Sequence, residues 1–201
     1  MLQETRAAVL AHGPAVSLDL VAGKLGVTQP ALLKRFGTRQ ALMIKALTPP
    51  QDAPFLKLLE SGPDDRRLEV QLRQIFVSML EFYEASVPCM LALRESGVGH
   101  EQVFTELRKA PPFRALELWG EWFERAAERG LVDASAPEGA ALAITGALHS
   151  RVMMNHIFKR EETPRAQHRF IDELVHLFTR ALSPHPTTAP LNTTQSTTRQ
   201  R

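Results

Sequence analysis

The chain has 201 residues, a hydrophobic fraction of 44% and a formal net charge of +2, which together suffice for a sizeable buried core and exclude a disordered chain. Its single cysteine, Cys89, excludes an intramolecular disulfide framework and favours a reducing compartment. Neither a signal peptide nor a run of about 18 apolar residues stands out, so we expect a cytoplasmic protein without a membrane span.

Basic side chains are concentrated in the first predicted helices. Residues 1–47 hold six Lys and Arg residues against Glu4 and Asp19, a balance of +4, and since the whole chain carries +2, the remainder carries −2. A basic head on a mildly acidic body is typical of a phosphate-binding domain attached to a regulatory domain.

Two short helices joined by a tight turn are predicted within residues 17–36, after a first helix over residues 2–12. Ser17 and Thr28 each precede a helical stretch and suit the N-cap position, and Gly26 can adopt the positive φ that ends the first of the two helices. Ala22 is small enough for the second helix to cross close to the first. The pattern predicts a helix-turn-helix that reads DNA.

The second of these helices is predicted to present polar and basic side chains to a DNA groove, because Leu32 and Phe36, four residues apart, face inward. Glutamine can bind an adenine edge, lysine can bind guanine or phosphate, and leucine or proline can contact a thymine methyl group. Thr38 caps the next helix, residues 39–47. The predicted DNA-binding residues are Ser17, Thr28, Gln29, Pro30, Leu33, Lys34, Arg35, Thr38 and Arg39.

From Gly26 to Leu42 the sequence GVTQPALLKRFGTRQAL resembles the DNA-binding domain of the tetracycline-repressor (TetR) family of bacterial regulators. The fitting positions are Phe36, Thr38 and Leu42, and the departures are Leu33 for the usual tyrosine, Arg35 for histidine, Arg39 for lysine and Gln40 for an acidic residue. The resemblance implies an all-α fold in which a three-helix helix-turn-helix domain precedes a larger helical domain that binds an effector and dimerises.

Further helices are predicted along the rest of the chain, at residues 54–60, 64–86, 111–129, 136–158 and 164–182, with short helical segments at 89–95 and 101–109. Pro49, Pro50 and Pro54 mark a boundary between domains at 1–47 and 48–182. Pro88 is predicted to interrupt a long helix, and Ser135 with Glu138 predicts a capping box. Residues 183–201 are rich in threonine and poor in apolar residues, so we expect a disordered tail.

Aromatic and sulfur-containing side chains in the body are the candidates for an effector site. Most such residues are ordinary core, but the resemblance implies a cavity among the central helices, which these side chains would line for a small hydrophobic effector. The predicted ligand-binding residues are Phe76, Met79, Tyr83, Met90, Phe104, Trp119, Trp122 and Phe123. The resemblance also implies a homodimer, with residues 140–156 and 167–182 as its seam.

Other chemistries have weaker support in the sequence. His149 and His156 lie two helical turns apart, too far for one metal ion without further ligands, and Cys89 is interpreted as an inert buried thiol. No nucleophile with a nearby base is apparent, so we expect no metal, no cofactor and no enzymatic activity. The favoured interpretation is a ligand-responsive repressor released from a palindromic operator on double-stranded DNA. The alternative is an all-α ligand carrier or enzyme that does not bind DNA.

Overall fold

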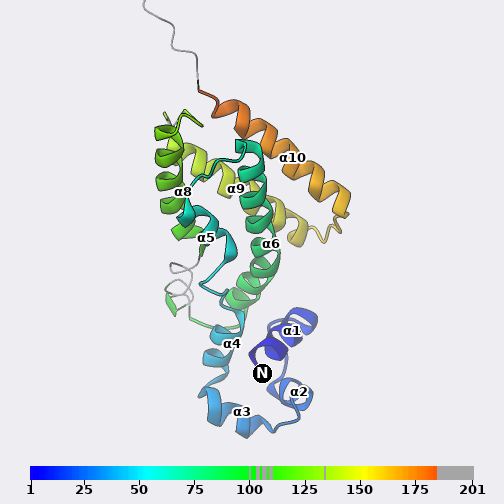
Figure 1. The fold of residues 1–201 in the computed structure, drawn as a ribbon. Coiled ribbons are helices and arrows are strands. Elements are labelled where there is room, and N and C mark those ends of the chain that lie inside the picture. The colour runs from blue at the N-terminus through cyan, green and yellow to red at the C-terminus, as the bar shows by residue number, and fades with distance from the viewer. Residues whose placement is uncertain (100, 103–104, 106–107, 109–110, 134, 185–201) are drawn as a thin grey trace, which may run out of the picture.

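The computed structural model describes residues 1–184 except 100, 103–104, 106–107, 109–110 and 134. All regular structure in these residues is helical, which confirms the predicted all-α class. The helices are α1 (Leu2–His12), α2 (Leu18–Lys24), α3 (Gln29–Phe36), α4 (Arg39–Leu47), α5 (Pro54–Ser61), α6 (Leu68–Glu95), α8 (Pro111–Glu128), α9 (Pro137–Ile157) and α10 (Pro164–Ala181). Figure 1 shows α1–α4, here called the head, at one end of the molecule and the other helices, the body, at the other.

The turn between α2 and α3 forms as the sequence predicts. Gly26 adopts a φ of 65°, its N–H donates to Gly23 O at 3.2 Å, and the N–H of Val27 donates to Ala22 O at 3.1 Å. This pair of hydrogen bonds is a Schellman motif, in which the residue with positive φ is nearly always glycine. Ala22 is 2% exposed beneath the turn.

Two hydrophobic cores share helix α6. Its first part carries Leu72 and Phe76 into the body core, whereas Cys89 and Leu93, beyond Pro88, pack into the head core. The head core thus contains side chains from α1–α4 and from the far end of α6. A domain division at residue 47 stays a prediction, and the structure adds that α6 belongs to both parts.

The prediction that Pro88 interrupts the long helix is wrong, because α6 continues from Leu68 to Glu95 with Pro88 inside. Proline removes one intrahelical hydrogen bond and displaces the carbonyl one turn earlier, which kinks a helix but does not end it where both flanks are held by packing. Here the two cores hold the flanks. The helix also begins at Leu68 and not at the predicted Asp64.

The segment before α6 is held by a buried glutamine. Gln71 is 3% exposed, accepts from the N–H of Asp64 at 2.8 Å and donates to the carbonyls of Asp64 and Arg66 at 3.1 and 2.6 Å. These bonds satisfy the loop's backbone in a non-helical conformation.

The predicted capping box at Ser135 is wrong. The N-cap of α9 is Ala136 without a side-chain hydrogen bond, and the backbone N–H of Ser135 donates to Asp133 Oδ1 at 2.9 Å. Pro137 occupies the first helical turn, where its missing N–H costs nothing.

Helix α6 is long and apolar enough to cross a membrane by length and composition, and among the helices of the described residues only α6 meets that criterion. Half of its most apolar window is buried inside the fold. A core helix shared by two cores has this composition for the same reason. Phe104, parts of the segment 101–109 and the predicted tail from residue 185 onward lie outside the described residues.

Candidate nucleic-acid interface and effector site

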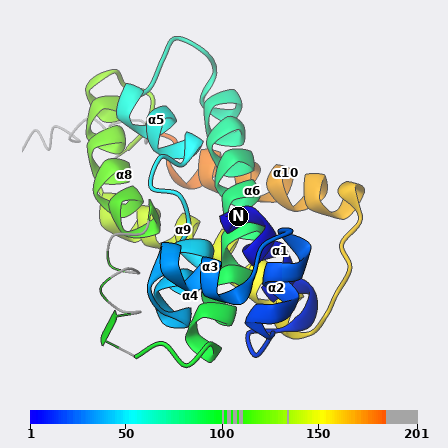
Figure 2. The ribbon, with the colours of Figure 1, turned by 90° about the horizontal axis from the view of Figure 1, so that it is seen from below.

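Helix α3 lies at the end of the head that is farthest from the body, with α2 beside it (Figures 1 and 2). Pro30, Lys34 and Arg35 are exposed on α3, whereas Gln29 and Leu33 are half-buried at its edge. Leu32 is fully buried and fixes the inner face of the helix. The outward face thus carries most of the side chains predicted to read DNA.

The three predicted hydroxyl contacts act as N-caps. Ser17 Oγ, Thr28 Oγ1 and Thr38 Oγ1 accept the N–H groups three residues ahead at 3.2, 3.3 and 3.0 Å. A capping hydroxyl accepts through oxygen, so its own proton remains available to donate to a phosphate. All three residues are exposed at the helix starts, where backbone N–H groups favour anions.

Two of the six basic residues of the head are bound to its own backbone. Arg39 donates from Nη1 to Val16 O and from Nη2 to Pro14 O, both at 2.7 Å, and thereby ties α4 to the loop before α2. Arg6 donates to Ala46 O at 2.8 Å and to Thr48 O at 3.3 Å at the end of α4. Both are half-buried, so the exposed basic surface of the head comes from the other four residues, of which Lys24 has its Nζ 3.3 Å from His12 Nε2.

Lys24 and Lys45 belong to that surface, although they were not predicted as contacts. Both are exposed in the last turn of their helices. The ring of Phe36 lies 6.0 Å from Lys45 Nζ and 5.8 Å from the guanidinium of Arg35. The charge count could have pointed to both lysines, but the position of Lys45 beside Phe36 of α3 depends on the tertiary fold.

Six of the eight predicted effector-binding residues lie together in the body core, and each is at most 1% exposed. Trp119 stacks on Phe123 with ring centroids 5.1 Å apart and meets Trp122 and Phe76 edge-on at 5.6 and 6.3 Å. Met90 is half-buried on α6, beyond Pro88. The aromatic side chains therefore form one cluster between α6 and α8, to which Met79 and Tyr83 also belong.

This cluster contains polar atoms without partners. Tyr83 Oη and Trp119 Nε1 are buried and have no hydrogen-bond partner among the described residues, and the same holds for Thr145 Oγ1 on α9. Burial raises the pKa of the Tyr83 phenol, which therefore remains a neutral donor. Unpaired buried donors are costly in a protein interior and become favourable when a ligand supplies acceptors.

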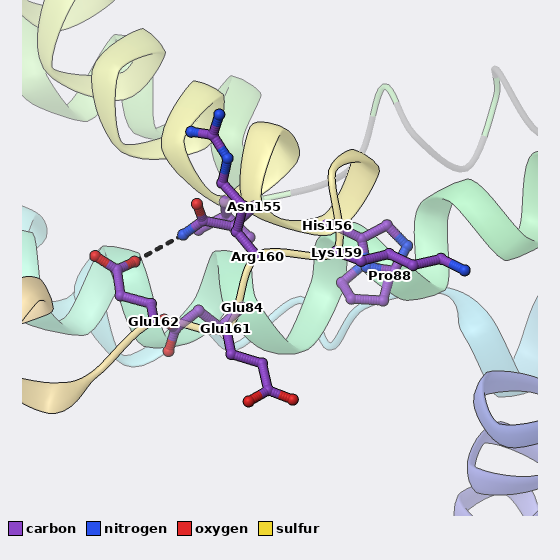
Figure 3. Close-up of a pocket in the computed structure, with 9 residues that line it drawn as sticks. Glu84, Pro88, Asn155, His156, Lys159, Arg160, Glu161 and Glu162 are labelled. Atoms are coloured by element: carbon purple, nitrogen blue, oxygen red, sulfur yellow. Dashed lines mark hydrogen bonds between the residues drawn. The ribbon is translucent and has the colours of Figure 1, made fainter.

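A separate polar cleft of about 540 Å³ lies between α6 and the connection from α9 to α10 (Figure 3). Asn155 Nδ2 donates to Glu162 Oε2 at 2.7 Å, and Arg151 forms an ion pair with the same carboxylate. Across the cleft, Glu84 accepts from Gln167, and burial raises the Glu84 pKa in spite of that bond. Glu84 and Glu162 thus already have partners in the protein, and the bond between Gln167 and Glu84 ties α10 to α6.

No protein-family model and no curated protein matches the sequence. Solved structures do match the fold. A protein from Mesorhizobium loti, described as a TetR-family transcriptional regulator, has a TM-score of 0.75 at 18% identity and covers 91% of this chain and 95% of its own. The chain has the TetR fold.

Two further matches agree. PfmR, a TetR-family regulator from Thermus thermophilus, has a TM-score of 0.66 at 16% identity, with 92% of this chain and 98% of its own covered. A Clostridium perfringens protein described as a fatty acid metabolism regulator has a TM-score of 0.64 at 14% identity, with the same two coverages. The match thus extends over head and body together.

The last two helices of this TetR fold leave apolar side chains in solvent. Leu142 and Ile157 on α9 are 63% and 56% exposed, and Leu177 on α10 is 58% exposed. The small residues Ala143 and Gly146, both exposed on α9, would allow a second helix to approach closely. Leu142 and Leu177 lie within the segments predicted as a dimer seam, and Ile157 directly follows one of them.

Proposed function

We propose that this chain is a DNA-binding transcriptional regulator that acts as a homodimer and responds to a small hydrophobic effector. The observation that carries the proposal is α3, which presents Lys34 and Arg35 at the tip of a TetR fold while its cap and turn hydrogen bonds are complete. A helix held in this way is suited to enter a major groove.

Two copies are needed for a specific site. One recognition helix reads only about four to six base pairs, too few to find one site among genomic competitors. The exposed apolar residues Leu142, Ile157 and Leu177 support α9 and α10 as the surface that joins the copies. The operator would then be a palindrome with one half-site for each head.

The effector would bind in the aromatic cluster of the body. Apolar rings favour a hydrophobic molecule, and the unpaired donors Tyr83 Oη and Trp119 Nε1 favour one that carries an acceptor oxygen. The Clostridium perfringens structure is described as a fatty acid metabolism regulator, and an acyl compound has this combination of groups.

Helix α6 is the route by which such an effector would act on DNA binding. It carries Phe76 and Tyr83 in the effector cluster and Leu93 in the head core, so a shift of its first part moves the head. A coupling of roughly 1–3 kcal/mol would weaken operator affinity by about 5- to 150-fold. We infer a repressor that the effector releases from DNA.

Selection from randomised DNA tests the reading element. Wild-type protein should enrich a palindrome, and Lys34→Ala should change the selected bases, whereas Lys45→Ala on α4 should weaken binding to all sequences without changing them. Each phosphate contact adds roughly 0.9 to the slope of log affinity against log salt. Enrichment of no sequence would favour the alternative, a helical ligand carrier or enzyme that does not bind DNA.

Light scattering tests the dimer. Leu177→Glu places a charge on the exposed apolar face of α10 and should yield monomers at micromolar concentration, while Val70→Glu, exposed on α6, should not. A wild-type protein that is monomeric in the same measurement would refute the dimer.

A further inference from the structure

A cavity of about 90 Å³ lies where the head meets the body. Its walls come from α1 through Arg6, from the end of α4 and the following prolines through Leu47 and Pro49, and from α6 through Phe82, Ser86 and Cys89. Because these elements belong to both the head and the body, any ligand in the cavity contacts both.

A charged and a polar side chain, Arg6 and Ser86, line the cavity. Ser86 is 3% exposed, and its Oγ has no hydrogen-bond partner within the described residues. The Arg6 guanidinium uses Nε and Nη2 for the carbonyls of Ala46 and Thr48, and its Nη1 has no acceptor among the residues that the structure describes. A hydroxyl and a cation together suit a carboxylate, which accepts from both.

The other walls are apolar and leave little room. Leu47, Pro49 and Phe82 offer carbon surface, and the volume equals that of roughly three waters. A cation is disfavoured by Arg6, and a long or branched acid does not fit. We propose that the cavity binds a monocarboxylate of short, unbranched chain, with its carboxylate between Arg6 and Ser86 and its carbon atoms against Phe82.

Covalent binding of a ligand by Cys89 is the weaker alternative for the role of this cavity. Burial raises the pKa of the thiol, although the charge of Arg6 opposes the shift, and Sγ donates to Ala85 O at 3.4 Å. A thiol in this state reacts slowly. Cys89 is therefore a wall of the site and, as the only cysteine in the chain, a natural reporter on it.

The experiment measures how fast methyl methanethiosulfonate labels Cys89 in the full chain, at constant ionic strength, in sodium propionate or sodium chloride. Propionate should slow labelling saturably, at least about fivefold, with a half-effect on the order of 1 mM. Chloride and the branched pivalate should have no such effect. Calorimetric titration with the same salts makes the same comparison without the label.

Two variants locate the binding. Ser86→Ala should raise the propionate concentration for half-effect about tenfold, whereas Ser78→Ala, two turns earlier on α6, should leave it unchanged. Ala85→Leu, which fills the cavity from the same helix, should abolish the propionate effect in both measurements. Labelling and heat that do not depend on propionate, or a half-effect unchanged in Ser86→Ala, would overturn the proposal, and neither outcome depends on DNA binding.

Discussion

Among the described residues, the buried polar side chains of the head have hydrogen-bond partners, whereas several of those in the body have none. Within residues 1–47, all of which the structure describes, no buried side-chain nitrogen or oxygen lacks a partner. In the part of the body that the structure describes, Tyr83 Oη, Trp119 Nε1 and Thr145 Oγ1 are buried without a hydrogen-bond partner. A head whose buried polar atoms are bonded holds one geometry, whereas unpaired donors in the body leave interaction energy for a ligand to supply.

The head and the body also differ in the interactions that make them rigid. The head is small and depends on specific bonds such as those of Arg39 and on a core that it shares with α6. The body has a larger core built from aromatic contacts and Met79, and the unbranched methionine side chain adapts to small rearrangements. We therefore expect the head to move as a unit on α6 while the body changes internally.

The largest expected effect tests the shared core. Leu93→Ala removes a fully buried side chain of α6 and should cost roughly 2–5 kcal/mol of stability. Although residue 93 lies far beyond the head in sequence, hydrogen exchange should accelerate most in α1–α4. Leu72→Ala, equally buried in the body core, is the control and should accelerate exchange in α8 and α9 instead. Identical exchange patterns in the two variants would show that the molecule has one cooperative core.

The next effect distinguishes a basic residue that stabilises the head from one that is predicted to contact DNA. Arg39→Ala leaves the carbonyls of Val16 and Pro14 without their donor and should destabilise the protein by about 1–3 kcal/mol in denaturant titration. Lys34→Ala removes an exposed side chain and should change stability by less than about 0.5 kcal/mol. If Arg39→Ala unfolds at the wild-type denaturant concentration and yet loses DNA affinity, the arginine acts on phosphate and its backbone bonds contribute little.

A third effect concerns the unpaired donors. Tyr83→Phe removes a hydroxyl that has no partner, so stability should stay the same or rise by about 1 kcal/mol in thermal unfolding. Under the proposed function, the same change should weaken the influence of a bound effector on operator affinity, because the acceptor of the effector loses its donor. A clear loss of stability would mean that the hydroxyl is bonded in solution, for instance to water.

Local signals made the head predictable from the sequence. The caps at Ser17, Thr28 and Thr38 and the turn at Gly26 depend on residues within a few positions of each other, and the structure has all four. Clustering of the aromatic residues also follows from helical spacing, although spacing cannot tell a packed core from a lined pocket.

Long-range contacts explain what the sequence could not provide. Arg39 is predicted to contact DNA, which stays a prediction, and its bonds to the carbonyls of Pro14 and Val16 come within reach only in the fold. Pro88 carries a local signal to stop a helix, and packing of both flanks overrides that signal. At Ser135 the capping pattern is present in the sequence, but in the fold the backbone N–H of Ser135 donates to Asp133 Oδ1.

The smallest effect is a pH dependence in the body. His149 packs edge-on against Tyr83 with centroids 5.4 Å apart, and burial lowers its pKa below the ordinary 6.5. The unfolded chain therefore binds a proton at His149 more readily than the folded chain does. The contribution of His149 to the unfolding free energy is fully present above about pH 6.5 and is lost as the pH falls toward the lower pKa of the folded state. Burial raises the pKa of Glu84, so its titration changes stability with pH in the opposite direction. The effect of His149 is therefore measured as the difference between the wild-type protein and a His149 variant. His149→Gln should flatten the decline in unfolding free energy below about pH 6.5, and curves that stay parallel would show that the imidazole titrates as it does in water.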